Sequence, residues 1–174
     1  TIAYWSGGKG GGTGTFGDVE SSFSNGFARD WDRTIEENIT YDDSSASARQ
    51  DYQGILRNSI NQQWTVGAIS KLFYKVNDNL NLQFGVDART AQIGHWREVR
   101  DLLGANSFYY DGNDFDAPAD YEKGLGDKIA FNFTNTVNWL GSYLQVDYST
   151  EKFSANIVAG ATANQYGYTN HFRM

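Results

Sequence analysis

Hydrophobic and polar positions alternate along residues 61–90, with an interruption at the sequence NDN of 77–79. A period of two is the signature of a β-strand, because successive side chains point to opposite faces of a sheet. Asn and Asp tolerate the backbone angles of tight turns, so the segment is predicted to be a β-hairpin. The apolar face of its second arm comprises Leu80, Leu82, Phe84, Val86 and Ala88. The polar face comprises Asn81, Gln83, Gly85, Asp87 and Arg89.

The first arm of this hairpin carries aromatic residues at both ends of its more apolar face. Trp64 and Tyr74 are ten residues apart, which is about the length of a tilted strand that crosses a bilayer. Aromatic rings at both edges of an apolar band are typical of transmembrane barrels. A soluble antiparallel sheet would also have one apolar and one polar face. Both arms, however, are longer than the roughly five or six residues of an average soluble strand.

Residues 139–162 repeat the pattern, with alternating arms on either side of the sequence STEK. Long strands are therefore predicted near 61–76, 80–96, 128–148 and 152–168, and a fifth, truncated strand is expected to end near Tyr4. The connections alternate between tight turns and long polar segments. The tight turns are 77–79 and 149–152, and the long segments are 5–58 and 97–127. Outer-membrane barrels have short periplasmic turns and long extracellular loops, whereas long structureless loops are uncommon in soluble domains.

Composition narrows the class of protein further. The 174 residues include no Cys, which excludes disulfides and thiolate metal sites, and the net charge of −7 argues against a nucleic-acid partner. No apolar run approaches the length that a transmembrane helix needs. The chain begins without an initiator Met or a signal sequence and ends without a terminal pattern, so it is expected to be a piece of a larger protein.

Motifs for catalysis are weak in this sequence. The glycine-rich run 7–17 contains a GxGxxG match, but no helical periodicity follows it, as a dinucleotide fold requires. These glycines more simply indicate unusual backbone angles or close approach where a strand passes into a loop. His95 and His171 have no partner at a metal-binding spacing, and no activated nucleophile is recognisable. We therefore expect no enzyme activity, no metal site and no cofactor.

Acidic residues are concentrated in the second long segment. Between Asp101 and Asp127 there are seven acids and one base, Lys123, which leaves a charge of −6. The simpler interpretation is a solvated surface loop. The functional interpretation is an acidic mouth that attracts cations or basic ligands.

Several blocks of this chain resemble the middle of the barrel of a TonB-dependent receptor, of the kind abundant in Bacteroidetes-like bacteria. The blocks are TIAYWSGGKGGGTG (1–14), ILRNSINQQW (55–64), LNLQFGVDARTAQIGHWREVRDLLGANSFYYD (80–111) and VNWLGSYLQVDYSTEKFSA (137–155). The resemblance covers essentially the whole chain, in order. It implies an all-β fold, with residues 1–174 forming part of a large antiparallel transmembrane β-barrel of about 22 strands around a plug.

The resemblance also implies a function and partners. The complete protein would take up a scarce ligand (a siderophore, cobalamin, a metal chelate or a glycan) across the cell outer membrane. Its partners would be membrane lipid and lipopolysaccharide, the rest of its own barrel and plug, the TonB, ExbB and ExbD proteins, and in some receptors a surface lipoprotein. This chain contains no plug, and five strands are too few to close a barrel. A passive porin, a barrel that anchors surface proteins and a soluble glycan-binding β-sandwich remain alternatives.

Candidate ligand-binding residues lie at the outer end of the predicted strand 80–96 and in the segment that follows it. Aromatic faces bind apolar or sugar surfaces, and neighbouring polar groups orient the ligand. The candidates are Trp96, Tyr109, Tyr110 and Asp111, with His95, Arg97, Arg100, Phe108, Asp114 and Asp116 close to them in sequence. The competing interpretation is that the aromatic residues only pack within the loops.

Overall fold

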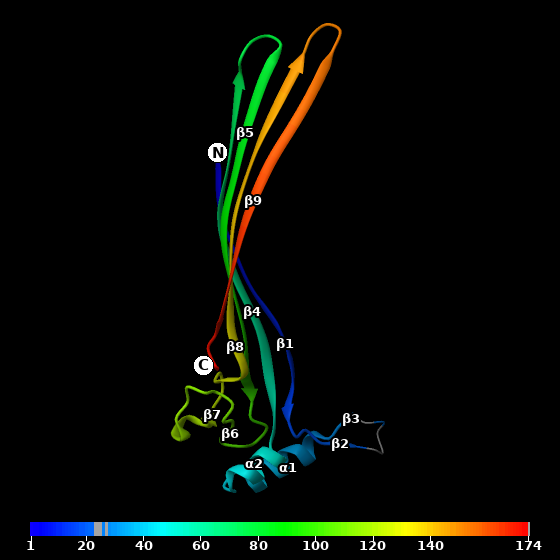
Figure 1. The fold of residues 1–174 in the computed structure, drawn as a ribbon. Coiled ribbons are helices and arrows are strands. Elements are labelled where there is room, and N and C mark those ends of the chain that lie inside the picture. Colours follow the sequence, from blue (N-terminus) through cyan, green and yellow to red (C-terminus); the bar gives the residue numbers. More distant parts are fainter. Residues whose placement is uncertain (23–25, 27, 174) are drawn as a thin grey trace. The chain divides into compact units, whose positions relative to one another are not determined.

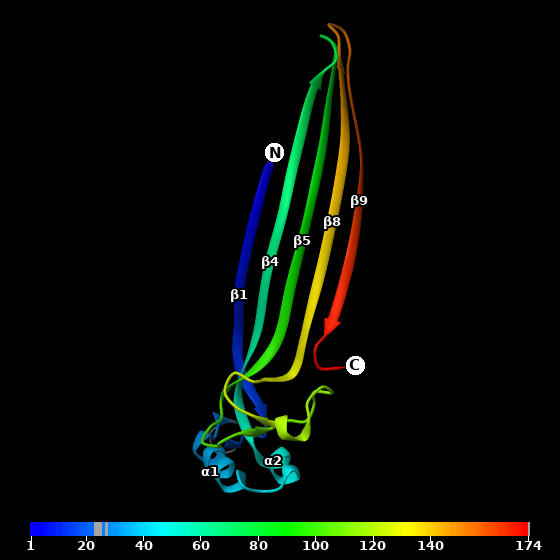
Figure 2. The ribbon, with the colours of Figure 1, turned by 90° about the vertical axis from the view of Figure 1, so that its left-hand side faces the viewer.

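A computed structural model describes residues 1–22, 26 and 28–173. Strands account for 63% of the chain and helices for 12%, which confirms the prediction of an all-β protein. The long strands of the described residues are β1 (Ile2–Gly17), β4 (Gly54–Lys75), β5 (Leu80–Asp101), β8 (Lys128–Ser149) and β9 (Ser154–Asn170). They form one antiparallel sheet in the order β1-β4-β5-β8-β9, with β1 and β9 at its edges (Figures 1 and 2).

The two predicted hairpins are confirmed. In the first turn, the backbone N–H of Val76 donates to the carbonyl of Leu80 at 3.0 Å, and Asn77 Oδ1 accepts from the N–H of Asn79 at 2.9 Å. In the second turn, the N–H of Thr150 donates to the carbonyl of Phe153 at 2.7 Å. The side chain of Asn77 therefore supports the first turn, as the sequence indicated, and the side chain of Thr150 also accepts from the N–H of Phe153 at 3.1 Å in the second.

Strand β1 is longer than predicted. It continues through the glycine-rich run to Gly17, so the expectation that it ends near Tyr4 is wrong. Glycine permits this run to pair closely, because a Cβ at Gly11 would lie 2.1 Å from the carbonyl oxygen of Ser59 on β4. Gly17, at the end of the strand, has a φ of +76°. Close approach and unusual backbone angles, the features expected of these glycines, are both present.

The two long connections contain secondary structure that the sequence analysis did not predict. Residues 18–53 contain the small strands β2 (Ser21–Ser22) and β3 (Ala28–Arg29) and the helices α1 (Trp31–Tyr41) and α2 (Ala46–Tyr52). The second segment contains β6 (Phe108–Tyr109), the 3-10 helix η2 (Pro118–Asp120) and β7 (Glu122–Lys123). Asp30 and Ser45 cap α1 and α2 by accepting hydrogen bonds from the backbone N–H groups of Arg33 and Ala48. No helix in the described part of the chain has the length and apolar character to span a membrane.

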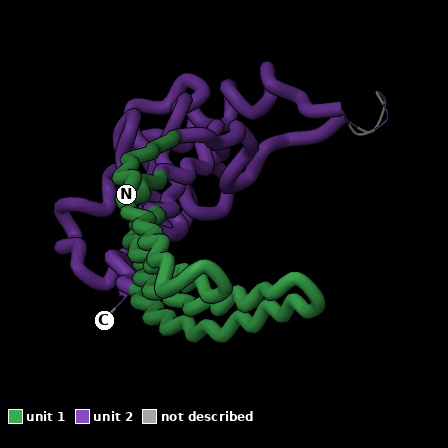
Figure 3. Tube along the Cα trace, turned by 90° about the horizontal axis from the view of Figure 1, so that it is seen from above, with its two compact units in different colours: residues 1–8, 63–93, 135–168 green, residues 9–62, 94–134, 169–174 purple. Residues whose placement is uncertain are grey.

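The chain divides into two compact units (Figure 3). Unit 1 comprises residues 1–8, 63–93 and 135–168, and unit 2 comprises residues 9–62, 94–134 and 169–174. Unit 1 consists of the beginning of β1 and the parts of β4, β5, β8 and β9 that the two tight turns join. Unit 2 holds the helices and small strands together with the remaining parts of the long strands.

Unit 2 contains a hydrophobic core. Ile55, Val99, Phe108 and Ile129 are buried, and Phe16, Leu102 and Tyr110 pack against them. Asn38 of α1 is fully buried beside this core, where it donates to the carbonyls of Gly54, Leu102 and Leu103 at 2.7–3.1 Å and accepts from the N–H of Gly54 at 2.9 Å. Since buried polar groups cost free energy unless they are paired, this residue fixes α1 to the ends of β4 and β5.

Unit 1 instead exposes many large apolar side chains. On the predicted apolar face, Leu72 is 64% exposed, Leu140 54% and Ile157 67%. Other exposed residues of this face are Trp64, Val66, Tyr74, Phe84, Leu144, Tyr148 and Phe153. An exposed apolar face of this extent requires a covering partner or an apolar solvent.

Candidate functional site

Tyr109 of β6 belongs to a polar and aromatic cluster in unit 2. The guanidinium of Arg49 on α2 donates two hydrogen bonds of 2.6 and 2.5 Å to the carboxylate of Glu122 on β7. The hydroxyl of Ser107 donates to the same carboxylate at 2.5 Å. The guanidinium carbon of Arg49 lies 5.5 Å from the centre of the Tyr109 ring, and the Tyr121 ring packs edge-on against Tyr109 at 5.8 Å. The cluster therefore combines a rigid cation, a carboxylate and two aromatic rings.

The charges of this cluster stabilise one another. The hydrogen bonds from Arg49 hold the pKa of the Glu122 carboxyl below its usual value, and Ser107 acts in the same direction. Partial burial raises the pKa of Tyr109, and the negative charge of Asp111 raises it further. At neutral pH the cluster therefore contains a charged Arg49–Glu122 pair and a neutral phenol. Such a surface can contact a neutral or amphipathic ligand through its rings.

Tyr110 faces the core, unlike its neighbour Tyr109. Its ring lies 6.3 Å from those of Phe16 and Phe172, and its hydroxyl is hydrogen-bonded to the backbone of Ala130. Ala130 has a φ of +64°, a conformation that costs a non-glycine residue free energy. These contacts support the packing interpretation for Tyr110, which lies against the core and the first residues of β8.

Trp96 lies in a different cluster of unit 2. Its indole N–H donates to Glu98 at 2.8 Å, and the ammonium groups of Lys9 and Lys128 lie 5.6 and 5.2 Å from its ring centre. Asp111 is an exposed residue in the segment between β6 and η2. Of the predicted ligand residues, the structure thus places Tyr109 and Asp111 near one another and assigns Trp96 to separate surroundings.

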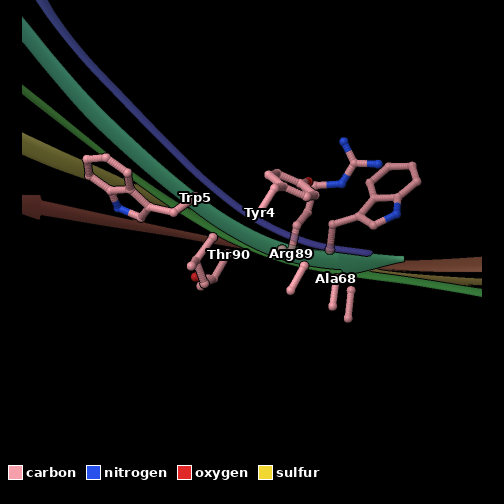
Figure 4. A pocket seen from close by; sticks show the side chains of 10 residues that line it. Tyr4, Trp5, Ala68, Arg89 and Thr90 are labelled. Carbon is pink, nitrogen blue, oxygen red and sulfur yellow. The ribbon is translucent and has the colours of Figure 1, made fainter. Parts of the chain in front are cut away.

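A second set of polar and aromatic residues occurs on the predicted polar face of unit 1. Arg89 forms an ion pair with Asp87, as their shared face suggested, and its guanidinium carbon lies 5.2 Å from the ring centre of Trp139. A shallow depression of about 710 Å³ is lined by residues of β1, β4, β5 and β8, including Tyr4, Arg89 and Trp139. Figure 4 shows Tyr4 and Arg89 on one side of the sheet and Thr90 on the other, which confirms the alternation.

On this face, aromatic rings from neighbouring strands lie over glycine residues. The Tyr4 ring lies over Gly67, where a Cβ would meet its hydroxyl oxygen at 2.5 Å, and the Tyr143 ring lies over Gly85, where a Cβ would meet Cε1 at 2.1 Å. The amide of Gln83 also donates to the Tyr143 hydroxyl. Glycine removes the side chain that would otherwise hold each ring away from the sheet.

The acidic segment 101–127 is partly neutralised by bases. Asp116 pairs with Lys123 at 2.5 Å, Asp114 with Arg173 at 2.8 Å and Glu122 with Arg49. These pairs favour the surface-loop interpretation over an acidic mouth. Across residues 1–22, 26 and 28–173, no group of three His, Asp or Glu residues is arranged to hold a metal ion.

The sequence did not reveal the contributions of Arg49, Tyr121 and Glu122. Arg49 lies 73 residues from Glu122, so spacing along the chain carries no signal of their contact. The short α2 helix that presents Arg49 has one cue, Ser45 at its N-cap position. Comparisons of this chain with protein-family models, with curated proteins and with solved structures find no match.

Proposed function

We propose that this chain is part of the barrel of an outer-membrane transporter of the TonB-dependent class, which takes up a scarce ligand into the periplasm. The observation that carries the proposal is the exposed apolar face of unit 1. Leu72, Leu140 and Ile157 are each more than half exposed on this face. Burial of such a face in a bilayer stabilises it by about 25 cal/mol for each square ångström removed from water.

The opposite face of the same strands supports an aqueous lumen. Arg89 and Asp87 pair there, and Trp139 covers the guanidinium of Arg89. On a lipid-facing surface an arginine at the bilayer midplane would cost about 2–4 kcal/mol. Charges confined to one face are therefore consistent with a sheet that separates lipid from a water-filled or plugged interior.

The connections support an orientation for the strands. Two short turns join β4 to β5 and β8 to β9, whereas the connections in unit 2 contain helices and small strands. Outer-membrane barrels place short turns in the periplasm and long loops outside. In this proposal unit 2 is extracellular, and the Arg49–Tyr109–Glu122 cluster lies on the side from which the ligand arrives.

Edge strands support the proposal that further strands complete the sheet. β1 and β9 have 16 and 17 residues and lie at the two edges of the sheet. Long unprotected edges promote association with other strands, and closure into a barrel removes them. The remaining strands and the plug would belong to the same complete protein.

Cell fractionation of the full-length protein tests this proposal. Recovery in the outer membrane, and extraction only with detergent, would support a barrel. Recovery in the soluble fraction without detergent would contradict it and favour a soluble aromatic-rich β-sandwich. A plug sequence ahead of the barrel in the same gene, and ligand uptake that stops when the proton gradient is collapsed, would distinguish a TonB-dependent transporter from a passive porin.

A further inference from the structure

Two arginines of unit 2, Arg57 on β4 and Arg97 on β5, lie close together without a counter-charge. Burial lowers the pKa of Arg97, and the positive charge of Arg57 lowers it further. Among the described residues, neither side chain forms an ion pair within 4.0 Å. The Nε of each guanidinium is buried, and in the part of the chain that the structure describes it has no hydrogen-bond partner. Like charges with unused donors are unfavourable, so an anion bound between them would be stabilising.

Both guanidinium groups are held in place by their surroundings. Arg57 Nη1 donates to the hydroxyl of Ser59 at 2.5 Å, and the group lies against Gly14 of β1, where a Cβ would be 3.1 Å from Nη2. The guanidinium carbon of Arg97 lies 4.9 Å from the centre of the Phe131 ring on β8. A planar cation stacked on a ring keeps its N–H donors free for a ligand. The two arginines are therefore ordered before an anion arrives, which lowers the entropic cost of binding it.

The acids of β5 do not neutralise this pair. Glu98 directly follows Arg97, so alternation places it on the opposite face of the strand, where it accepts from the indole N–H of Trp96 at 2.8 Å. Asp101 is four residues from Arg97, which is about 13 Å along an extended strand, and it accepts a hydrogen bond from a backbone N–H. The counter-charge for the two arginines must therefore come from outside these strands.

Aromatic rings lie beside the two arginines. The His95 ring stacks on Phe133 with their centres 4.9 Å apart, and the Phe133 ring lies 5.6 Å from Phe131. Nδ1 of His95 is hydrogen-bonded to Oδ1 of Asn61 at 2.5 Å, which orients the imidazole. All three rings are half-buried, so part of each remains accessible. Such rings suit the apolar or aromatic body of a small ligand.

We infer that Arg57 and Arg97 bind the phosphate group of a small phosphomonoester, whose apolar body lies on the rings of Phe131, Phe133 and His95. A phosphomonoester carries a charge of about −1.5 to −2 near neutral pH, which matches two cations, whereas one carboxylate neutralises only one of them. The planar fork of arginine also fits two phosphate oxygens at once. The inference goes beyond the proposed function and requires only residues of unit 2.

Calorimetric titration of the purified full-length protein tests this site. The probe is phenyl phosphate, and benzoate and phenol are the same ring with a single negative charge and with none. Phenyl phosphate should bind about tenfold or more tighter than benzoate, because the second charge adds a charge-assisted contact to the second arginine. Phenol should bind more weakly than benzoate.

Substitution of the arginines tests their role directly. Arg57→Gln and Arg97→Gln should each weaken the binding of phenyl phosphate by about tenfold or more, since each removes one charge and its donors. Arg97→Lys keeps the charge and loses the planar fork, so its affinity should lie between those of the unsubstituted protein and Arg97→Gln. Arg100→Gln is the matched control, because Arg100 is on the same strand at the alternate position and donates to Thr13 instead. Its affinity should be unchanged.

Four results would overturn the site. They are no detectable binding of phenyl phosphate by the unsubstituted protein, equal binding of benzoate or phenol, unchanged affinity in both glutamine variants, and an equal loss of affinity in Arg100→Gln. Where a glutamine variant does not fold, Arg97→Lys decides the question. Undiminished affinity in that variant would show that the fork of Arg97 does not hold the phosphate.

Discussion

Arg49 and Glu122, which are 73 residues apart in sequence, are joined by two hydrogen bonds of 2.6 and 2.5 Å. This bidentate pair fastens α2 to the β6–β7 hairpin and holds the Tyr109 ring beneath the guanidinium of Arg49. The side chain of Arg49 is 12% exposed and that of Glu122 is 43% exposed. The pair thus joins the first long connection of the chain to the second.

Acid should release this pair. The pKa of Glu122 is lowered in the folded protein, so its contribution to stability is complete above the unfolded pKa and is lost as pH falls through the folded pKa. Glu122→Gln should remove this part of the pH dependence and destabilise the contact by about 0.5–1 kcal/mol, the upper part of the range for exposed pairs. Hydrogen exchange of α2 amides, measured from neutral pH down to about pH 3, would report the release.

Glu36→Gln, on the exposed surface of α1, is the matched control and should leave the exchange of α2 unchanged. Equal protection of α2 in Glu122→Gln and the unsubstituted protein at neutral and acidic pH would show that the pair does not hold this helix.

Replacement of Asn38 should release α1. Asn38→Ala leaves the backbone groups of Gly54, Leu102 and Leu103 without the partner they have in the buried site. Each buried group that loses its partner costs about 1–3 kcal/mol, so α1 should lose protection from hydrogen exchange. Thr40→Ala, on the exposed side of the same helix, should have a small effect. Normal protection of α1 in Asn38→Ala would contradict this role.

Substitution of Gly85 should disturb the polar face of unit 1. In Gly85→Ala, the new Cβ would lie 2.1 Å from the Tyr143 ring, so the ring must move and lose its hydrogen bond from Gln83. Overpacking of this kind costs about 1–3 kcal/mol, measurable by urea unfolding in detergent micelles. Gly8→Ala, which has open space around the added methyl group, is the control. Equal destabilisation by the two substitutions would exclude ring contact as the cause.

Tyr109 and Tyr110 should respond differently to substitution. Tyr109→Ala is expected to weaken ligand capture by the full-length protein by about 1 kcal/mol or more, as truncation of an anchor does. Tyr110→Phe removes the hydrogen bond to Ala130 and should cost about 1 kcal/mol of stability while leaving ligand affinity unchanged. Titration of the two purified variants with the transported ligand, alongside thermal unfolding, separates these effects. Unchanged affinity of a normally assembled Tyr109→Ala protein would move the ligand site elsewhere.

Alternation along the chain was sufficient to predict the hairpins and the two faces of β5. The side chain of Asn77 accepts a hydrogen bond from the N–H of Asn79, so local chemistry indicated the first turn, whereas the second was indicated by the break in alternation at 149–152. The length of β1 was not, because a glycine-rich strand lacks the side chains that create a period of two. Close approach of Gly11 to Ser59 explains why glycine is used there, and this approach depends on the neighbouring strand.

The candidate site was predictable only in part. Tyr109 and Tyr110 are adjacent in sequence and both aromatic, yet one meets Arg49 and the other meets Phe16 and Phe172. Adjacent residues of a strand point to opposite faces, but which face is buried depends on residues far away in the chain. Contacts between residues far apart in the sequence therefore determine which of the two tyrosines packs in the core, and the local sequence does not.

The central claim is that the two faces of β5 meet different solvents. The chain contains no Cys, so Phe84→Cys and Asp87→Cys each provide a single attachment point for a nitroxide spin label. In the full-length protein reconstituted into bilayers, we predict that the label at position 84 collides mainly with dissolved oxygen, which partitions into lipid. The label at position 87 should collide mainly with a water-soluble nickel chelate. Equal accessibility of the two labels to the two quenchers would contradict a sheet with one lipid-facing side.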